Sequence, residues 1–204
     1  MTHSGQFSYT PDAGFKGTDS FSYRNMDVTI DEPRTFVEFG SSWKFLDDGS
    51  DQGSDWIEND FNDDDWSAGY AELGYGDGDE VTVVGYGPDE NNKYITTYFR
   101  HMFTVNNAVD IQTLTFSLKR DDGAVVYLNG NEVIRSNMPS GTVHYDTFAS
   151  TTTGSGEEDT FFSWTLSANL ILDGQNIIAV EIHQVSGFSS DISFDLELSG
   201  TSYS

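Results

Sequence analysis

Two short segments place aromatic and charged side chains in an alternating order that suits sugar binding. The letters YFRHMF begin at Tyr98, and the letters EIHQ begin at Glu181. Side chains of a β-strand point alternately to its two faces, so Tyr98 shares a face with Arg100. For the same reason Glu181 shares a face with His183. If the two strands are neighbours, all four residues lie on one exposed sheet face, where tyrosine rings cover sugar rings and the arginine fork binds hydroxyls, carboxylates or sulfates.

Further candidates are expected at the border of this face. The sequence GYGPDENNKY is rich in Gly, Pro and Asn, as loops are, and we expect it to overhang the face with Tyr86, Asn92 and Tyr94. Arg120 and Asp122 stand at the end of an expected strand, where they would belong to the rim. We therefore predict that all nine residues bind a glycan. In the alternative interpretation, both arginines only neutralise acidic neighbours and the tyrosines cover the core.

The chain is strongly acidic, because its 204 residues include 34 Asp and Glu but only 9 Lys and Arg, a formal net charge of −25. Eleven of the acids lie within Asp47–Gly78, which we expect to be a long loop. Calcium binds roughly six to eight oxygen ligands and accepts flexible loops. We therefore predict a structural calcium ion. Its candidate ligands are Asp63, Asp64, Asp77 and Asp79. The alternative is an acidic surface surrounded by solvent.

The same composition excludes several classes of protein. Without Cys, the chain has no disulfides, no thiol catalysis and no thiolate metal site. No apolar run approaches the roughly 18 residues of a membrane-spanning helix, and the basic residues are scattered, so we expect neither a membrane nor a nucleic-acid partner. The 4 Trp, 10 Tyr and 15 Phe argue against disorder. No GxSxG or HExxH motif occurs, and we do not expect an enzyme.

Period-two alternation of apolar residues, bounded by Gly, Asn and Asp, predicts strands along most of the chain. The clearest are Tyr98–Val105, Thr113–Lys119, Ala124–Leu128, Thr160–Leu166, Asn176–Gln184 and Ile192–Leu198. The expected core positions are Leu114, Phe116, Leu118, Ile178, Val180, Ile182, Phe194, Leu196 and Leu198. Shorter strands are expected at Arg34–Phe39 and Ser42–Leu46, a tight hairpin turn at Asn129–Gly130, and a single helical turn near Ser167–Leu172. Many short strands joined by turns predict an all-β jelly-roll β-sandwich.

Longer motifs carry two resemblances to known families. Gly5–Tyr23 reads GQFSYTPDAGFKGTDSFSY and resembles the C-terminal half of a cadherin-like bacterial immunoglobulin-fold repeat, roughly GxFxYTPxxGFxGxDSFxY. Residues 34–200, with the motifs WKFLDDGSDQGSDW, RDDGAVVYLNGNEV and QNIIAVEIHQ, resemble a galactose-binding-like jelly-roll module. The last two motifs are also similar to the sugar-binding domains of β-galactosidase-type hydrolases. We therefore expect a partial repeat at residues 1–31 and the jelly roll at residues 32–204.

The resemblances also bear on calcium. Galactose-binding-like modules often carry a structural calcium near the start and end of the sandwich, which implies Asp195 as a further ligand. The Asp121–Asp122 pair resembles the adjacent aspartates of protective-antigen-like adhesin modules, which hold a calcium ion that touches sugar hydroxyls. A tight turn before a strand is the alternative interpretation of the same two residues.

The galactose-binding-like resemblance implies a function. Such a module would be a non-catalytic carbohydrate-binding module that attaches a larger secreted bacterial protein to a polysaccharide. Its other implied partners are the neighbouring domains of that protein, and we expect the module itself to be a monomer. One alternative is a structural spacer that supports an adjacent domain and binds no glycan. The other is a small jelly-roll polysaccharide lyase.

Overall fold

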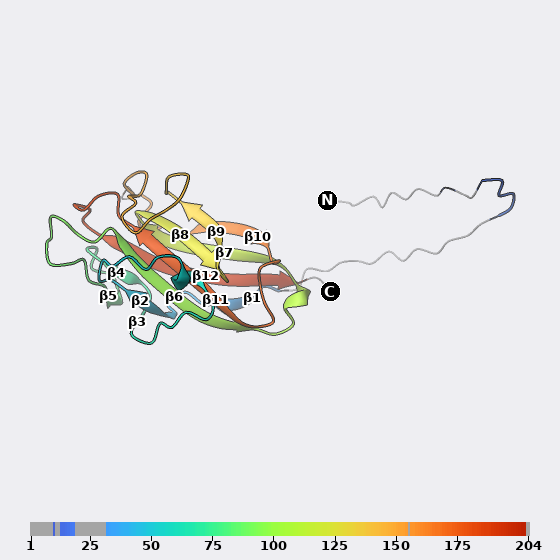
Figure 1. Ribbon diagram of the computed structural model, residues 1–204, viewed down its shortest axis with the longest axis horizontal. Coiled ribbons are helices and arrows are strands. Elements are labelled where there is room, and N and C mark those ends of the chain that lie inside the picture. Colours follow the sequence, from blue (N-terminus) through green and yellow to red (C-terminus); the bar gives the residue numbers. More distant parts are fainter. Residues whose placement is uncertain (1–9, 11–12, 19–31, 155, 203–204) are drawn as a thin grey trace.

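Alternating apolar residues form most of the strands of this protein, and the strands build a β-sandwich. The computed structural model describes residues 10, 13–18, 32–154 and 156–202. Within these residues, twelve strands form two sheets that pack face to face, as Figure 1 shows. The predicted all-β sandwich is therefore confirmed.

The first sheet has the strand order β10–β7–β12–β4–β5, and β1 also pairs with β12. Its strands are β1 (Arg34–Val37), β4 (Leu73–Tyr75), β5 (Thr82–Val83), β7 (Ile111–Asp121), β10 (Phe162–Ser167) and β12 (Ile192–Ser202). All of its strand pairs are antiparallel except β4 with β5. The long ladder between β7 and β12 forms the centre of this layer.

The second sheet has the strand order β3–β2–β6–β11–β8–β9. Its strands are β2 (Ser42–Leu46), β3 (Ser67–Tyr70), β6 (Thr96–Val105), β8 (Gly123–Leu128), β9 (Asn131–Ser136) and β11 (Gly174–His183). Every pair in it is antiparallel. Strands β6 and β11 therefore occupy the middle of the layer, where the predicted sugar-binding residues lie.

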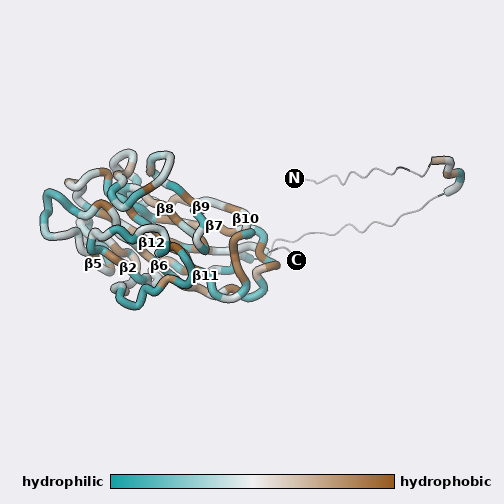
Figure 2. Tube along the Cα trace, viewed as in Figure 1, coloured by the Kyte–Doolittle hydropathy of each residue, from teal (hydrophilic) through white to brown (hydrophobic). Residues whose placement is uncertain are grey.

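The main core fills the space between the two sheets. All nine predicted core positions on β7, β11 and β12 are buried in it, which confirms the alternation of these strands. Phe99 of the second sheet packs on Phe194 of the first, with 4.3 Å between ring centres, and Trp43 contacts the same ring at 4.8 Å. In Figure 2 the hydrophobic segments concentrate along the strands, whereas the long loops are mainly hydrophilic.

The outer face of the second sheet is also buried, because two loops fold over it. The β2–β3 loop (residues 47–66) contains the single-turn 3-10 helix η1 (Asp55–Ile57), which contacts β11. Figure 1 shows this segment in teal running across β6 and β11. The β9–β10 loop (residues 137–161) covers β8, where Val125 packs with Met138 and Ala149. Strand β11 is consequently buried on both faces from Asn176 to His183.

Two local predictions differ from the structure. The expected loop Asp47–Gly78 ends at Trp66, because the strands β3 and β4 follow within it; β4 has only three residues, too few to show an alternation. The expected helical turn near residues 167–172 is a hydrogen-bonded turn rather than a helix, in which Ile171 N donates to Ala168 O at 3.1 Å.

The hairpin between β8 and β9 matches its prediction. Asn129 and Gly130 have φ values of 49° and 78°, the left-handed backbone that a two-residue turn requires and that Asn and Gly adopt most readily. The turn is also fixed by side-chain hydrogen bonds, since Asn129 Nδ2 donates to Asn176 Oδ1 at 2.8 Å.

The predicted immunoglobulin-like segment lies mostly outside the described residues. Only residues 10 and 13–18 of the range 1–31 are described, so the division of the chain at residues 31 and 32 stays a prediction. Among the described residues, no helix has the length and apolar character needed to cross a membrane.

Candidate functional site

The strands β6 and β11 bring the predicted sugar-binding residues together, as their alternation indicated. They are antiparallel neighbours, with Tyr98 directly opposite Glu181. The face is not exposed, however, and this part of the prediction is wrong. The exposed fractions are 3% for Tyr98, 1% for Arg100, 5% for Glu181 and 0% for His183. The β2–β3 and β9–β10 loops cover the face that an isolated sheet would present to solvent.

Arg100 holds the β2–β3 loop against the sheet. Its Nε donates a hydrogen bond to Asp63 Oδ2 at 2.7 Å, and its Nη2 donates to the carbonyl of Glu58 at 3.2 Å. Nη1 donates to the carbonyl of Trp56. The guanidinium also lies over the ring of Phe61, 5.1 Å from its centre. Acceptors of the chain itself therefore occupy Arg100, and a glycan could contact it only if the loop opened.

Aromatic rings complete the contact between the β2–β3 loop and the sheet. Trp56 packs edge-on against Tyr98, with 4.8 Å between ring centres, and against Tyr127 at 5.7 Å. Trp66 belongs to the same cluster. Burial raises the pKa of Tyr98 above its usual range, and the negative charge of Glu181 raises it further. The ring of Tyr98 thus mainly covers the sheet, as the alternative interpretation expected.

Glu181 and His183 form a buried polar pair next to this cluster. The Tyr127 hydroxyl donates to Glu181 Oε1 at 2.7 Å. His183 Nδ1 lies 2.7 Å from the carbonyl oxygen of Thr147 and 2.9 Å from Thr96 Oγ1. Because a carbonyl oxygen only accepts hydrogen bonds, we assign a proton to Nδ1. His183 thereby ties the β9–β10 loop to the sheet, while its Nε2 lies 3.2 Å from Glu181 Oε2.

Arg120 and Asp122 lie beneath loops rather than on an open rim, which corrects their predicted placement. Arg120 is 5% exposed; its Nε donates to Ser136 Oγ at 3.0 Å and its Nη1 donates to Thr153 Oγ1 at 2.8 Å. Asp122 is 1% exposed and accepts hydrogen bonds from the backbone N–H groups of Thr153 at 2.7 Å and Val185 at 2.8 Å. Both residues therefore hold the β7–β8 turn to the surrounding loops.

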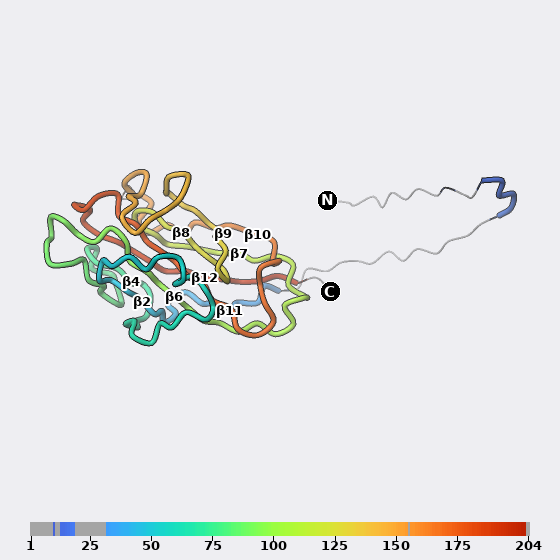
Figure 3. Tube along the Cα trace, in the orientation of Figure 1, coloured from blue at the N-terminus to red at the C-terminus, as the bar shows by residue number. Residues whose placement is uncertain are grey.

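An open cleft remains beside the covered face, and it begins with a cavity of about 510 Å³ that we call the Tyr94 pocket. Residues of the β2–β3, β5–β6 and β9–β10 loops line it; the β5–β6 loop is the green segment that projects from one end of the sandwich in Figure 3. The predicted binders Asn92 and Tyr94 are among the lining residues. So are Tyr145 and Phe148, whose side chains are 40% and 48% exposed.

Two glycines determine where the Tyr94 ring lies. Gly49 and Gly87 both have left-handed backbones, with φ values of 75° and 96°. A Cβ atom on Gly49 would overlap the Tyr94 ring, and one on Gly87 would lie 3.0 Å from it. The ring therefore packs directly on the backbone of two loops, an approach that only glycine permits.

The cleft continues into a second cavity of about 380 Å³, which we call the Glu181 pocket. Trp56, Tyr98 and Tyr127 line it together with Glu181. Tyr145 lines this pocket as well as the Tyr94 pocket, so the two cavities adjoin at this residue. The cleft thus extends over a length greater than one pocket, although Trp56, Tyr98 and Glu181 are each at most 5% exposed.

Tyr86, the remaining predicted binder, lines neither pocket. Its ring packs on Tyr75, with 5.1 Å between ring centres, and lies 5.7 Å from the Lys93 ammonium. Lys93 Nζ donates to the carbonyl of Ser189 at 2.5 Å. These contacts fix the base of the β5–β6 loop.

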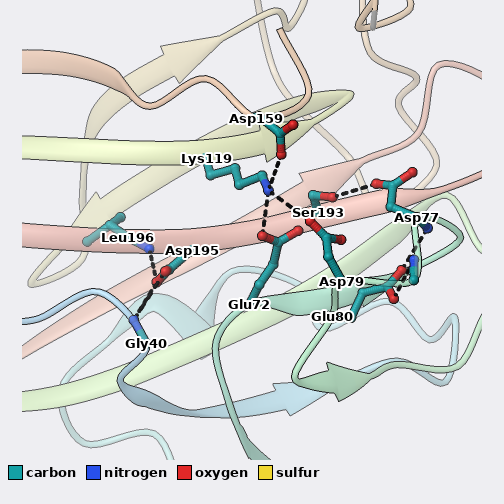
Figure 4. A network of polar contacts seen from close by, with 11 residues as sticks. Gly40, Glu72, Asp77, Asp79, Glu80, Lys119, Asp159, Ser193, Asp195 and Leu196 are labelled. Atoms are coloured by element: carbon teal, nitrogen blue, oxygen red, sulfur yellow. Dashed lines mark hydrogen bonds and ion pairs between the residues drawn. The ribbon is translucent and has the colours of Figure 1, made fainter.

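The predicted calcium ligands do not form one group. Asp63 pairs with Arg100 in the β2–β3 loop, where Asp64 is exposed. The ligands Asp77, Asp79 and Asp195 lie elsewhere, in the network that Figure 4 shows. Among the described residues, no three or more His, Asp or Glu are arranged to hold a metal ion.

Lys119 supplies the positive charge of the Figure 4 network. Its ammonium donates to Glu72 Oε2 at 2.6 Å and to Asp159 Oδ1 at 3.0 Å, and it lies 3.7 Å from Asp79 Oδ2. Despite the burial of the ammonium, these carboxylates raise the pKa of Lys119 above its usual range. The Lys119 ammonium thus offsets part of the negative charge of Asp79.

Asp77 and Asp195 differ in how well they are compensated. The Asp195 carboxylate accepts hydrogen bonds from the backbone N–H groups of Gly40 at 3.1 Å and Leu196 at 2.8 Å. Asp77 accepts one from Ser193 Oγ at 3.2 Å, but burial and the neighbouring carboxyl of Asp191 raise its pKa to about 6. Asp77 is therefore the predicted ligand that would gain most from a cation.

Sequence reasoning missed Tyr145 and Phe148, two aromatic residues of the cleft. Both lie in the polar β9–β10 loop, which has no alternation from which to infer their direction. Large aromatic side chains within a stretch of Ser, Thr, Gly and Asp were the available signal, since exposed aromatics often mark binding surfaces.

No family model and no curated protein sequence matches the chain. Solved structures do match it. β-Glucuronidase 2 of Bacteroides uniformis, covalently bound to cyclophellitol-6-carboxylate aziridine, aligns with 83% of this chain at 16% identity and a TM-score of 0.52. Another structure of a B. uniformis β-glucuronidase aligns with 83% at 16% identity and a TM-score of 0.53. Each alignment covers 18% of the matched chain, so this protein spans less than a fifth of their length, and the likeness concerns the fold.

Proposed function

We propose that this protein is a non-catalytic carbohydrate-binding module and that it holds a polysaccharide in the cleft formed by the Tyr94 and Glu181 pockets. The observation that carries the proposal is the exposure of Tyr145 and Phe148 inside a cleft that also contains Tyr94 and Asn92. Partly exposed aromatic rings lose apolar hydration when they stack on the C–H side of a sugar, and amide groups satisfy its hydroxyls.

The length of the cleft favours a chain of sugars over a single one. Both pockets share Tyr145, so a ligand that passes its ring can contact each of them. The proposed module belongs to a larger secreted bacterial protein, in which it attaches neighbouring domains to the polysaccharide. This part of the proposal is supported by the fold, which also occurs as a part of the much longer chains of the structural neighbours.

Affinity electrophoresis through gels that contain different polysaccharides tests the proposal. We expect at least one polysaccharide to retard the wild-type protein. Tyr145→Ala should weaken the binding at least tenfold, which corresponds to about 1.4 kcal/mol. Tyr70→Ala is the matched control, because Tyr70 is 63% exposed on β3 and lines neither pocket.

Retardation by no polysaccharide, or equal losses in both variants, would contradict this assignment. The first result would favour the second candidate function, a structural spacer. One observation supports that candidate: Arg100, Arg120 and His183, which could have bound sugars, are used to hold loops on the sheet.

A further inference from the structure

We infer that the cleft selects glycans that carry protonated amino groups, such as polymers of glucosamine, over uronate or sulfated glycans. This inference rests on the proposed function and adds the chemical class of the ligand. It follows from the charges that line the cleft and from the positions of the basic side chains around it.

Acidic residues line both parts of the cleft. Asp89 and Asp146 border the Tyr94 pocket, and Asp51 and Glu181 border the Glu181 pocket. No hydrogen bond or ion pair within the described part of the chain engages the Asp146 carboxylate, and this residue is exposed. Within the described residues, the carboxylates of Asp51 and Asp89 each accept a hydrogen bond only from a backbone N–H group two residues further along their own loop. No lysine or arginine of the described residues therefore pairs with Asp51, Asp89 or Asp146, whereas Glu181 is buried and accepts a hydrogen bond from the Tyr127 hydroxyl.

Lysine and arginine are almost absent from the same surface, although His144 lines the Glu181 pocket. Among the residues that line the two pockets, all of them described, Lys93 is the sole lysine or arginine. Its ammonium donates to Ser189 O at 2.5 Å and lies within 6 Å of the ring centres of Tyr75 and Tyr86, three residues that line neither pocket. The two arginines near the covered face, Arg100 and Arg120, are buried in contacts with the chain. A uronate or sulfate in the cleft would thus meet several carboxylates and no free lysine or arginine.

An amino sugar fits this arrangement better than a neutral sugar does. The aromatic rings of Tyr94, Tyr145 and Phe148 can stack on any sugar ring, so they do not distinguish the two ligands. An ammonium group on the sugar adds charge-assisted hydrogen bonds to carboxylates such as that of Asp146. The net charge of −25 also attracts a cationic polymer from a distance, most strongly at low salt.

Isothermal titration calorimetry with three matched oligosaccharides tests the inference. The probes are a β-1,4-linked glucosamine oligomer, the same oligomer fully N-acetylated, and an oligogalacturonate of equal length. At mildly acidic pH, where the sugar amine is protonated, we expect affinity to decrease in that order. Asp146→Asn should weaken binding of the amino oligomer about two- to fivefold, as expected for an exposed ion pair, and leave the N-acetylated oligomer unchanged. Asp110→Asn, an exposed acid outside both pockets, is the control.

The outcomes separate this inference from the proposed function. Equal binding of the amino and N-acetylated oligomers, with no effect of Asp146→Asn, would overturn the inference and leave the module a sugar binder. Tighter binding of the oligogalacturonate would also overturn the inference alone. If oligolysine displaced the amino oligomer as efficiently as the oligomer displaces itself, the cleft would recognise charge and not sugar. If none of the three oligosaccharides nor any other polysaccharide bound, both proposals would fail.

Discussion

Arg100 Nε lies 2.7 Å from Asp63 Oδ2, and this ion pair joins the centre of a sheet to the loop that covers it. The Arg100 side chain is 1% exposed and that of Asp63 22%, so removing the guanidinium leaves a largely covered carboxylate and the carbonyls of Trp56 and Glu58 without their donor. We expect Arg100→Gln to lower the free energy of unfolding by about 3–5 kcal/mol, the usual loss when one side of a buried ion pair is removed. This loss can be measured by denaturant unfolding with Trp fluorescence as the signal, since Trp56 and Trp66 lie in the same loop.

A second ion pair provides the control for Arg100→Gln. Arg135 Nη2 also lies 2.7 Å from a carboxylate, that of Glu132, but both side chains are partly exposed. Glu132→Gln, which removes this pair but leaves the Arg135 hydrogen bonds to the carbonyls of Pro139 and Gly141 in place, should therefore change the free energy of unfolding by only about 0.2–1 kcal/mol. Similar losses in both variants would mean that Arg100 does not hold the loop as described.

The burial of the His101 imidazole predicts that the stability of the protein depends on pH. Burial lowers the pKa of His101, although its hydrogen bond to the carbonyl of Ser42 at 2.8 Å raises it in part. The folded protein thus binds this proton less tightly than the unfolded chain, whose His pKa is about 6.5. The stabilising contribution is present above that pH and is lost as the pH falls below it.

The His101 contribution can be isolated with an isosteric donor. Asn at position 101 keeps an N–H group for the Ser42 carbonyl but cannot gain a proton. We expect the free energy of unfolding of His101→Asn to decrease less than that of the wild type between pH 7.5 and pH 5.5. A parallel decrease in both proteins, measured by urea unfolding, would assign the acid sensitivity to other groups.

The sequence predicted the strands well and the site poorly, for one physical reason. Alternation reports which residues share a face, and it correctly grouped Tyr98 with Arg100 and Glu181 with His183. It does not report what covers that face. The β2–β3 loop buries this face, and the loop is held there by the hydrogen bond between Arg100 and the carbonyl of Trp56. These residues are 44 positions apart, so no local sequence pattern encodes their contact. Tyr94, which lines the cleft, could be predicted as a candidate because it stands in a Gly-rich loop.

Calcium remains a prediction, and Asp77 is the position where its effect should be largest. The Asp77 and Asp191 carboxyls lie close together, and the pKa of Asp77 is raised to about 6. A cation that binds only the folded protein at 100 times its Kd adds about 2.7 kcal/mol of stability. We expect millimolar calcium to raise the Tm above its value in EDTA, and Asp77→Asn to reduce the increase.

Asp79→Asn is the matched control for the calcium test. Asp79 is exposed and lies 3.7 Å from the Lys119 ammonium, so a positive charge of the protein already offsets the charge of its carboxylate. Its substitution should leave the calcium-dependent increase in Tm unchanged. Identical melting curves of the wild type in calcium and in EDTA would reject a structural ion.

Gly49 links backbone conformation to the cleft. Its φ of 75° strains any residue with a Cβ, and the Cβ itself would overlap the Tyr94 ring. Gly78, between β4 and β5, has a similar φ of 84°, but a Cβ there would have no neighbour within 4 Å, and the residue lines neither pocket. Both Gly→Ala substitutions should therefore cost about 1–2 kcal/mol of stability from the left-handed backbone.

Only Gly49→Ala also displaces the Tyr94 ring, so it alone should weaken polysaccharide binding, by about tenfold if one aromatic contact worth 1.4 kcal/mol is lost. Equal retardation of the two variants in affinity gels would show that Tyr94 does not contact the glycan, and the binding surface would then have to be sought around Tyr145 alone.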